Sequence, residues 1–394
     1  MSESNEEKKQ SLTSNKWRAV AVAALCLLIA VAVLYALGVG WKQDGTKEAA
    51  VSPAAVTAAA DVKEAETPAA AKPSADEMLS YWTPESRTRQ ELTAYMAAVT
   101  DESSPDFIPV EDRIAVFDFD GTLFCETDPT YFDYCLLKYR VLEDPEYKDK
   151  ASDFEKSVAE EIASGTHASD LPTRHGQAVA SAFKGMTLAE FSAYVQEFKK
   201  QPMPHYEGMN RGDGFYLPML QIVNYLEAND FTVYVISGTD RLIVRGIFEN
   251  NVMPLSPARI IGSDESLVSS NNTEGADGLS YEYRPDDSVV LGGDFIIKNL
   301  QYNKVAVIAK EIGQQPVLSF GNSSGDYSMA EYTVSNNPHK ALAFMLCCDD
   351  LDRENGNTKK ADSMVEKCAD MGWIPVSMKN DWTTIYGDSV KYVK

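Results

Sequence analysis

The sequence predicts an α/β protein with a mainly parallel sheet. Residues 114–117 (Ile-Ala-Val-Phe) are apolar on both faces of a strand, and residues 231–236 (Phe-Thr-Val-Tyr-Val-Ile) are β-branched, aromatic or apolar. Strands that are apolar on both faces occur where helices cover both sides of a sheet. Residues 216–229 and 304–313 carry apolar side chains at helical spacing. Predicted helices and strands therefore alternate, as they do in parallel sheets.

Composition excludes one class of partner. The chain has 394 residues, of which 44% are hydrophobic, so a sizeable core in one or two domains is expected. The formal net charge is −23. Because nucleic-acid binding requires a basic surface, we expect no nucleic-acid partner. Oligomeric state cannot be predicted from these observations.

The N-terminal region predicts a membrane anchor. After a tail at 1–18, residues 19–40 form an uncharged stretch long enough to cross a bilayer as a helix, with Trp17 and Trp41 at its two ends. More Lys and Arg precede the stretch than follow it, so the N-terminus should be cytoplasmic. We expect a single-pass protein of the bacterial inner membrane with its folded part outside the cytoplasm. The alternative is a signal peptide cleaved near 36–38, which would release a secreted or periplasmic protein.

Residues 41–74 are rich in Ala, Glu, Lys and Pro. This composition cannot form a core, so the segment is predicted to be a tether. The folded part should begin near residue 75, with an amphipathic helix over 78–99. Five cysteines lie outside the apolar stretch, an odd number, and none has zinc-site spacing.

The predicted strand at 114–117 ends in two aspartates. Asp118 and Asp120 are separated by one residue, so strand alternation places both side chains on one side of the chain. Ligands bind at the carboxyl ends of strands in open α/β sheets. Two neighbouring carboxylates repel each other unless a cation lies beside them or one is protonated. A plain acidic turn accounts for one aspartate but not for two.

The run Asp-Phe-Asp-Gly-Thr-Leu at 118–123 resembles the first motif of the haloacid dehalogenase-like (HAD) phosphohydrolase superfamily. This resemblance implies a Rossmann-like, doubly wound parallel sheet formed by 75–123 and 231–394. It also implies that Asp118 is a nucleophile and Asp120 a general acid/base. An acid at the position of Asp120 argues against a dehalogenase, because a leaving halide needs no proton.

The long segment 124–230 has mostly helical patterning and is too long for a simple crossover. The resemblance implies that it is a helical cap over the active site. Glu126 lies directly after the first motif and is followed by several aromatic residues. An acidic residue among aromatic rings is suited to a cationic group such as an amine or a quaternary ammonium, although the aromatics could equally form the core of the cap.

The second motif of the superfamily is a strand followed by a small hydroxyl residue and Gly, and Ser237-Gly238-Thr239 matches it. The Ser237 hydroxyl and the N–H groups of Gly238 and Thr239 are expected to bind a phosphoryl oxygen. The third motif is a lysine, for which Lys298 and Lys304 are both candidates. We favour Lys304 because it begins a predicted helix and can face the loops at the rim of the site. A hairpin is expected at 279–291.

The fourth motif follows the predicted strand at 316–320. The superfamily places two carboxylates there, four residues apart, whereas this chain has Asn322 and then Asp326. The predicted Mg²⁺ ligands are Asp118, Asp120, Asn322 and Asp326, since Mg²⁺ prefers oxygen ligands. The amide at Asn322 leaves open how Asn322 and Asp326 share the metal.

Together these motifs imply Mg²⁺-dependent hydrolysis of a phosphomonoester through a phosphoaspartate. Segments such as 183–187 and 372–378 also resemble secreted phosphorylcholine phosphatases of the phosphoserine phosphatase-like branch. The expected substrate is a small extracytoplasmic phosphorylated metabolite, for which amino phosphates and choline phosphate are candidates. The alternatives are a catalytically degenerate domain that acts as a membrane-tethered binding module, a phosphotransferase, and a tethered structural protein, which would leave the four ordered motifs unexplained.

Overall fold

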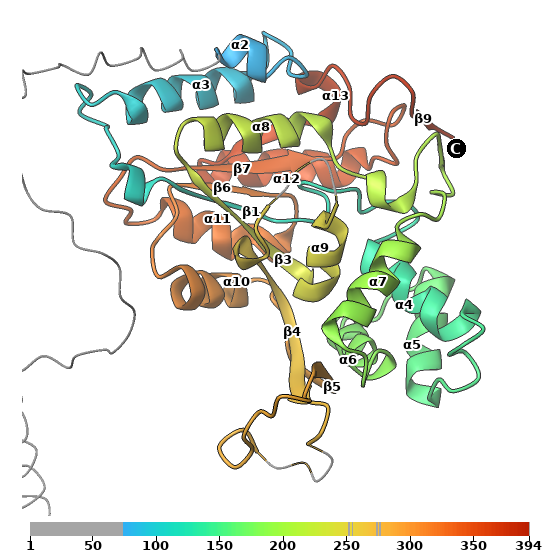
Figure 1. The fold of residues 1–394 in the computed structure, drawn as a ribbon. Helices are drawn as coiled ribbons and strands as arrows, with labels where there is room; N and C mark the ends of the chain where they lie inside the picture. The colour runs from blue at the N-terminus through green and yellow to red at the C-terminus, as the bar shows by residue number, and fades with distance from the viewer. Residues whose placement is uncertain (1–73, 251–252, 254, 273–274, 276, 394) are drawn as a thin grey trace, which may run out of the picture. The chain divides into compact units, whose positions relative to one another are not determined.

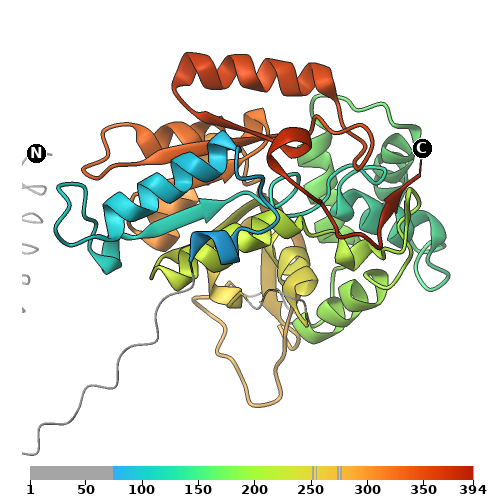
Figure 2. The same ribbon diagram turned by 90° about the horizontal axis from the view of Figure 1, so that it is seen from above.

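The computed structural model describes residues 74–250, 253, 255–272, 275 and 277–393. The predicted tail at 1–18, membrane helix at 19–40 and nearly all of the tether at 41–74 lie outside this part of the chain. Among the described residues, no helix has both the length and the apolar character needed to span a bilayer. Figure 1 and Figure 2 show these residues as a central sheet with helices above and below it.

The central sheet has seven strands within the described residues, in the order β5-β4-β3-β1-β6-β7-β8. Neighbouring strands are parallel except for β4 and β5, which are antiparallel. The predicted α/β class with a mainly parallel sheet is therefore confirmed. The strands are β1 (Ile114–Phe117), β3 (Thr232–Asp240), β4 (Ile260–Ser269), β5 (Val289–Ile297), β6 (Leu318–Gly321), β7 (Leu342–Cys347) and β8 (Ile374–Ser377).

Strand β1 is buried on both faces, as its sequence predicts. Ala115 and Phe117 face one part of the core, whereas Ile114 and Val116 face another. The Phe117 ring stacks on Phe320 of β6 with centroids 4.3 Å apart, and Phe320 in turn stacks on the Phe344 ring of β7. These stacked rings connect the three neighbouring strands β1, β6 and β7 at the end of β1.

Helices cover both faces of the sheet (Figure 1). They are α2 (Ala75–Met78), α3 (Arg87–Thr100), α8 (Leu217–Ala228), α9 (Arg241–Phe248), α10 (Tyr302–Val307), α11 (Tyr327–Val334), α12 (Thr358–Met371) and α13 (Met378–Asp381). Short helical turns are η1 (Val110–Asp112), η3 (Arg211–Asp213), η4 (Pro257–Arg259), η5 (Ile308–Ile312) and η6 (Ser324–Asp326). The single helix predicted over 78–99 is wrong, because Pro84 interrupts it and Ser86 caps a new helix at Arg87.

Four helices between β1 and β3 form the bundle that corresponds to the predicted cap. They are α4 (Phe132–Lys138, continued by the π-helical turn η2, Tyr139–Glu143), α5 (Asp153–Ser164), α6 (Leu171–Ala182) and α7 (Leu188–Phe198). Capping boxes begin α5 at Ser152 and α7 at Thr187. Helix α6 packs on β5 and α7 packs on α9. Helix α8, which the predicted range 124–230 includes, packs against β3 instead.

The hairpin predicted at 279–291 is placed differently. Its strands are β4 and β5, which pair from Ser269↔Val289 to Asp264↔Ile297 and extend away from the body of the domain (Figure 1). The described residues between the two strands form no further strand or helix. The loop is rich in Ser, Asn and Asp, which favour turns over strands. A separate two-stranded sheet joins β2 (Tyr206–Glu207) to β9 (Lys391–Tyr392).

Candidate active site

Asp118 and Asp120 lie where β1 ends, at the carboxyl edge of the sheet. The Asp118 N–H donates to the carbonyl oxygen of Phe320 at 2.8 Å, so β6 holds the backbone at this point. Gly121 follows with a φ of +75°, and a Cβ there would lie 1.8 Å from the Asn322 side-chain nitrogen and 2.6 Å from Glu126 Cδ. The turn after the aspartates therefore requires glycine both for its backbone conformation and for space.

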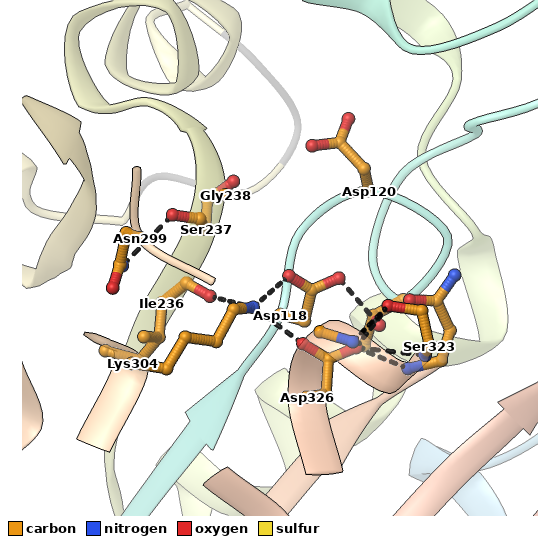
Figure 3. A network of polar contacts seen from close by, with 12 residues as sticks. Asp118, Asp120, Ile236, Ser237, Gly238, Asn299, Lys304, Ser323 and Asp326 are labelled. Atoms are coloured by element: carbon orange, nitrogen blue, oxygen red, sulfur yellow. Dashed lines mark hydrogen bonds and ion pairs between the residues drawn. The ribbon is translucent and has the colours of Figure 1, made fainter. Parts of the chain in front are cut away.

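Lys304 is the lysine that reaches the aspartates. Its side chain is completely buried, and its Nζ contacts the carboxylates of Asp118 and Asp326, the latter at 2.7 Å (Figure 3). The same Nζ donates to the carbonyl oxygen of Ile236 at 2.6 Å. Lys298, the other candidate, instead lines the cavity above the site. Of the two lysines, Lys304 is therefore the one that lies against the aspartates.

The loop after β6 holds Asp326 in place. One oxygen of Asp326, Oδ1, accepts from Lys304, while Oδ2 accepts from the backbone N–H groups of Asn322 and Ser323 at 3.1 and 3.0 Å. The Asn322 side chain is directed to a different neighbour: it lies beside Gly121 and hydrogen-bonds Glu126. The carboxylate that joins Asp118 is therefore that of Asp326.

The side chain of Asp120 has different neighbours from that of Asp118. Its Oδ2 accepts a hydrogen bond from Thr239 Oγ1 at 2.7 Å, and its Oδ1 is buried without a partner among the described residues. In Figure 3 the Asp120 carboxylate points away from the group formed by Asp118, Lys304 and Asp326. The side chain of Asp120 is thus separated from the carboxylates of Asp118 and Asp326, which suits the acid/base role predicted for it more than that of a third carboxylate ligand.

The second motif is partly brought to the site. Gly238 and Thr239 line the cavity, but Ser237 is completely buried and does not line it. The Ser237 Oγ accepts from the Thr239 N–H at 3.0 Å, so two of the groups predicted to bind a phosphoryl oxygen are bonded to each other. Strand β3 continues through Asp240, beyond the predicted end at residue 236, and its register shifts between Ile236 and Asp240.

The charges of the site act strongly on one another. Burial, followed by the neighbouring charge of Asp326, raises the pKa of Asp118 to about 7, although Lys304 opposes the shift. Burial and the charges of Asp133 and Asp118 hold the pKa of Asp120 well above its usual range. Burial lowers the pKa of Lys304, but the two carboxylates that it contacts outweigh burial and raise it. These shifts favour the charged form of Lys304 and the protonated form of Asp120.

A cavity of about 110 Å³ opens above these residues. Its floor comes from the sheet edge, with Asp118, Asp120, Thr239 and Asp326, and its other wall comes from the segment after the first motif and the cap. Residues from that wall are Glu126, Tyr131, Asp133, Tyr134 and Pro172. The volume holds a phosphoryl group and a few further atoms, so the cavity accepts a small molecule.

Sequence reasoning missed two side chains of this site. Thr122 donates its hydroxyl to Asp118 Oδ2 at 3.2 Å. Asp133 lies in the cavity wall, 15 residues beyond Asp118, and is almost fully buried. The Thr122 hydroxyl two residues after Asp120 was a usable signal, whereas nothing in the pattern of α4 distinguishes Asp133 from a solvent-facing acid.

The donor set suits Mg²⁺. Asp118 and Asp326 supply carboxylate oxygens close enough for the charge of one to raise the pKa of the other. Lys304 supplies only one positive charge against these two carboxylates. Mg²⁺ commonly takes one or two carboxylates and keeps several waters. In the described part of the chain, no three His, Cys, Asp or Glu side chains converge as a metal site, so the remaining ligands would be amide or backbone oxygens and water.

Comparison with known proteins adds few constraints. No family model and no curated protein matches the chain. Among solved structures, a conserved protein of unknown function from Anaerococcus prevotii is 14% identical, with 74% of this chain and 91% of that chain covered and a TM-score of 0.46. Cytosolic 5′-nucleotidase IIIB bound to cytidine is 10% identical (74% and 86% covered, TM-score 0.44).

A phosphoserine phosphohydrolase-like protein from Francisella tularensis is 12% identical, with 66% of this chain and 98% of that chain covered and a TM-score of 0.35. Phosphatases are thus among the solved structures that resemble this chain. Likeness at these identities and TM-scores assigns no activity to the chain. The chemistry below rests on the geometry of the site.

Proposed function

We propose that this protein is a phosphomonoesterase of the HAD type. The observation that carries the proposal is the pair of aspartates at the end of β1 with different surroundings. Asp118 contacts a buried, charged lysine, whereas Asp120 keeps an unpartnered buried oxygen and a raised pKa. A nucleophile needs its negative charge, and a general acid needs its proton. The contact with Lys304 favours the charged form of Asp118, and the raised pKa of Asp120 favours its protonated form, so the two surroundings suit these two roles.

In the first step, an oxygen of Asp118 attacks the phosphorus atom of the substrate. The bond from phosphorus to the ester oxygen breaks, and Asp120 gives its proton to that oxygen, so the alcohol leaves and a phosphoaspartate remains. Lys304 stays between Asp118 and Asp326, where its charge offsets the negative phosphoryl oxygens. Mg²⁺ bound by Asp118 and Asp326 would supply further positive charge at those oxygens.

In the second step, the deprotonated Asp120 accepts a proton from water. The water oxygen attacks phosphorus, the bond between phosphorus and Asp118 breaks, and inorganic phosphate leaves. Thr239 donates to one oxygen of Asp120 and thereby orients the other toward the cavity that it lines. The unpartnered Asp120 Oδ1 is the atom proposed to move the proton in both steps.

The proposed substrate is a small phosphorylated metabolite, with amino and choline phosphates as the leading classes. The small cavity supports a small leaving group, and Glu126, Tyr131 and Tyr134 line its wall. Burial raises the pKa of Glu126 to about 7, with the Asn322 hydrogen bond opposing the shift. A cationic leaving group would favour the charged form of Glu126.

The decisive test is phosphate release from p-nitrophenyl phosphate by the full-length protein, with and without Mg²⁺, for the wild type and Asp118→Asn. We expect wild-type turnover that depends on Mg²⁺, loss of at least about a thousandfold in the variant, and nearly equal thermal unfolding midpoints. Turnover by Asp118→Asn would contradict the nucleophile assignment. Absence of wild-type turnover with Mg²⁺ would favour the binding module, and transfer of phosphate to an added alcohol would favour a phosphotransferase.

A further inference from the structure

Asp133 is an acid for which the protein itself provides no partner. It lies in the first turn of α4, is 2% exposed, and lines the catalytic cavity together with Asp120. Its Oδ1 is buried without a hydrogen bond, and within the described part of the chain no residue donates a hydrogen bond to its carboxylate. A buried carboxylate without donors is strongly unfavourable, so such groups normally have a cation beside them.

His175 of α6 is the nearest basic side chain, and it does not neutralise Asp133. Its Nδ1 lies 3.7 Å from Asp133 Oδ2, beyond hydrogen-bonding distance. Its Nε2 lies 3.3 Å from the backbone carbonyl oxygen of Asp133, so this contact involves the main chain and not the carboxylate. Burial lowers the pKa of His175 to about 4, although Asp133 opposes the shift. The imidazole is therefore neutral at neutral pH and adds no positive charge beside the Asp133 carboxyl group.

We propose that Asp133 binds an ammonium group that bears N–H donors on the leaving group of the substrate, an inference that rests on the proposed phosphomonoesterase function. Asp120 protonates the ester oxygen in that function, and Asp133 lines the same cavity. A substituent close to the ester oxygen therefore meets Asp133. The substrate class is a phosphate ester of an amino alcohol whose amine is primary or secondary.

Two observations favour an N–H-bearing ammonium over a quaternary one. The unpartnered Asp133 oxygen needs a hydrogen-bond donor, which a trimethylammonium lacks. Trimethylammonium groups are bound by open aromatic faces, but one face of Tyr134 lies against the His175 ring at a centroid distance of 4.3 Å. Tyr131 meets Tyr134 edge to face at 5.2 Å, so the two rings offer few free faces.

Lys298 also lines this cavity, with a charge of the opposite sign. It is only partly buried and water can solvate its ammonium, so it does not require a partner. Asp133 is only 2% exposed and its Oδ1 is buried without a partner, so it is much less open to water than Lys298. The difference in burial therefore indicates that Asp133, and not Lys298, needs a bound ligand as its partner.

Calorimetric titration of full-length protein with three non-hydrolysable phosphonates tests the inference in the presence of Mg²⁺. The probes are aminoethylphosphonate, ethylphosphonate and trimethylammonioethylphosphonate. For the wild type we expect the amino compound to bind about 10- to 100-fold more tightly than the ethyl compound, since it forms a charge-assisted hydrogen bond. The trimethylammonio compound should exceed the ethyl compound by less than about threefold.

In Asp133→Asn we expect the preference for the amino compound to fall to less than about threefold. Asp153→Asn, which removes an exposed acid of the same cap at the start of α5, should keep the wild-type preference. An unchanged preference in Asp133→Asn, or equal binding of the amino and trimethylammonio compounds to the wild type, would overturn the inference. Binding of the amino and ethyl compounds to the wild type with equal affinity would also overturn the inference. That result does not depend on whether a variant folds.

The two proposals fail separately. If the protein hydrolyses p-nitrophenyl phosphate but shows no preference for the aminated phosphonate, the inference about Asp133 is wrong and the phosphomonoesterase stands. If the amine preference is present and lost in Asp133→Asn, but no phosphate ester is hydrolysed, the cation site stands and the catalytic function is wrong.

Discussion

The Lys304 ammonium is completely buried and contacts the carboxylates of Asp118 and Asp326. Removing one partner from a buried ionic group leaves the other charges without compensation, which typically destabilises a protein by about 3–5 kcal/mol. The same contact places positive charge beside the proposed nucleophile. At the scale of a single residue, stability and chemistry therefore depend on one side chain.

For Lys304→Met we expect the free energy of unfolding to fall by about 3–5 kcal/mol. We also expect phosphatase activity to fall by at least about a thousandfold relative to the wild type. Chemical denaturation and phosphate release measure the two effects. Lys310→Met, which changes an exposed lysine in the turn that continues the same helix, is the matched control and should leave both nearly unchanged. Wild-type stability in Lys304→Met would contradict the buried ion group.

At the scale of elements, the pair β4–β5 contains a buried acid that does not line the proposed active-site cavity. Both oxygens of Glu265 lack partners among the described residues. Burial, followed by the charges of Asp240 and Asp264, raises the pKa of Glu265 from 4.5 to about 9. Arg241 pairs with Asp264 and does not neutralise Glu265. The folded protein therefore retains a proton that the unfolded chain releases.

This shift predicts how stability changes with pH. The stability that comes from protonated Glu265 is present below its unfolded pKa of 4.5, and it is lost as pH rises through the folded value of about 9. Glu265→Gln should therefore unfold like the wild type near pH 4.5 and be about 1–3 kcal/mol more stable near pH 8. Denaturation curves at both pH values check this. Glu282→Gln, in the exposed loop after β4, should show no such difference.

Some helices and strands could be predicted from local sequence patterns alone, and others could not. Strand β1 follows its predicted range because local apolar periodicity specifies it. The helix predicted over 304–313 is present, but it begins two residues earlier, at Tyr302, and continues after Val307 as the π-helical turn η5. Helix α3 and the β4–β5 pair differ from prediction. The first depends on an interruption by Pro84, and the second on pairing between strands separated by a long loop. Local periodicity contains no information about such pairing.

At the scale of the whole molecule, metal binding should be visible as stability. A ligand that binds only the folded state raises the thermal midpoint by mass action. We expect millimolar Mg²⁺ to raise the midpoint of the wild type by a few degrees. Asp326→Asn should lose most of that shift, whereas Asp362→Asn, at an exposed position of α12, should keep it. A shift of wild-type size in Asp326→Asn would remove Asp326 from the metal site.

The predicted membrane anchor is a second property of the whole chain, and it rests on the sequence of residues 19–40. We propose that the full-length protein remains with bacterial inner membranes after a high-salt wash, because a span of this length inserts stably. Deleting 19–40 should move the protein to the soluble fraction. Finding the intact wild type soluble, with its N-terminus removed near residue 37, would favour the cleaved signal peptide instead.

The sequence by itself determined the chemistry available to this protein. Asp118, Asp120, Lys304 and Asp326 could be predicted because they match, in order, the motifs by which the chain resembles the HAD superfamily, and because apolar strands and a helix pattern surround them. Tertiary structure alone decided how they act. It brings Lys304 across 186 residues to Asp118, separates the Asp120 carboxylate from the ion group, and leaves Asp133 unpaired in the cavity wall. The physical reason is that burial and charge pairing depend on distances in space, which residue types and spacing do not specify.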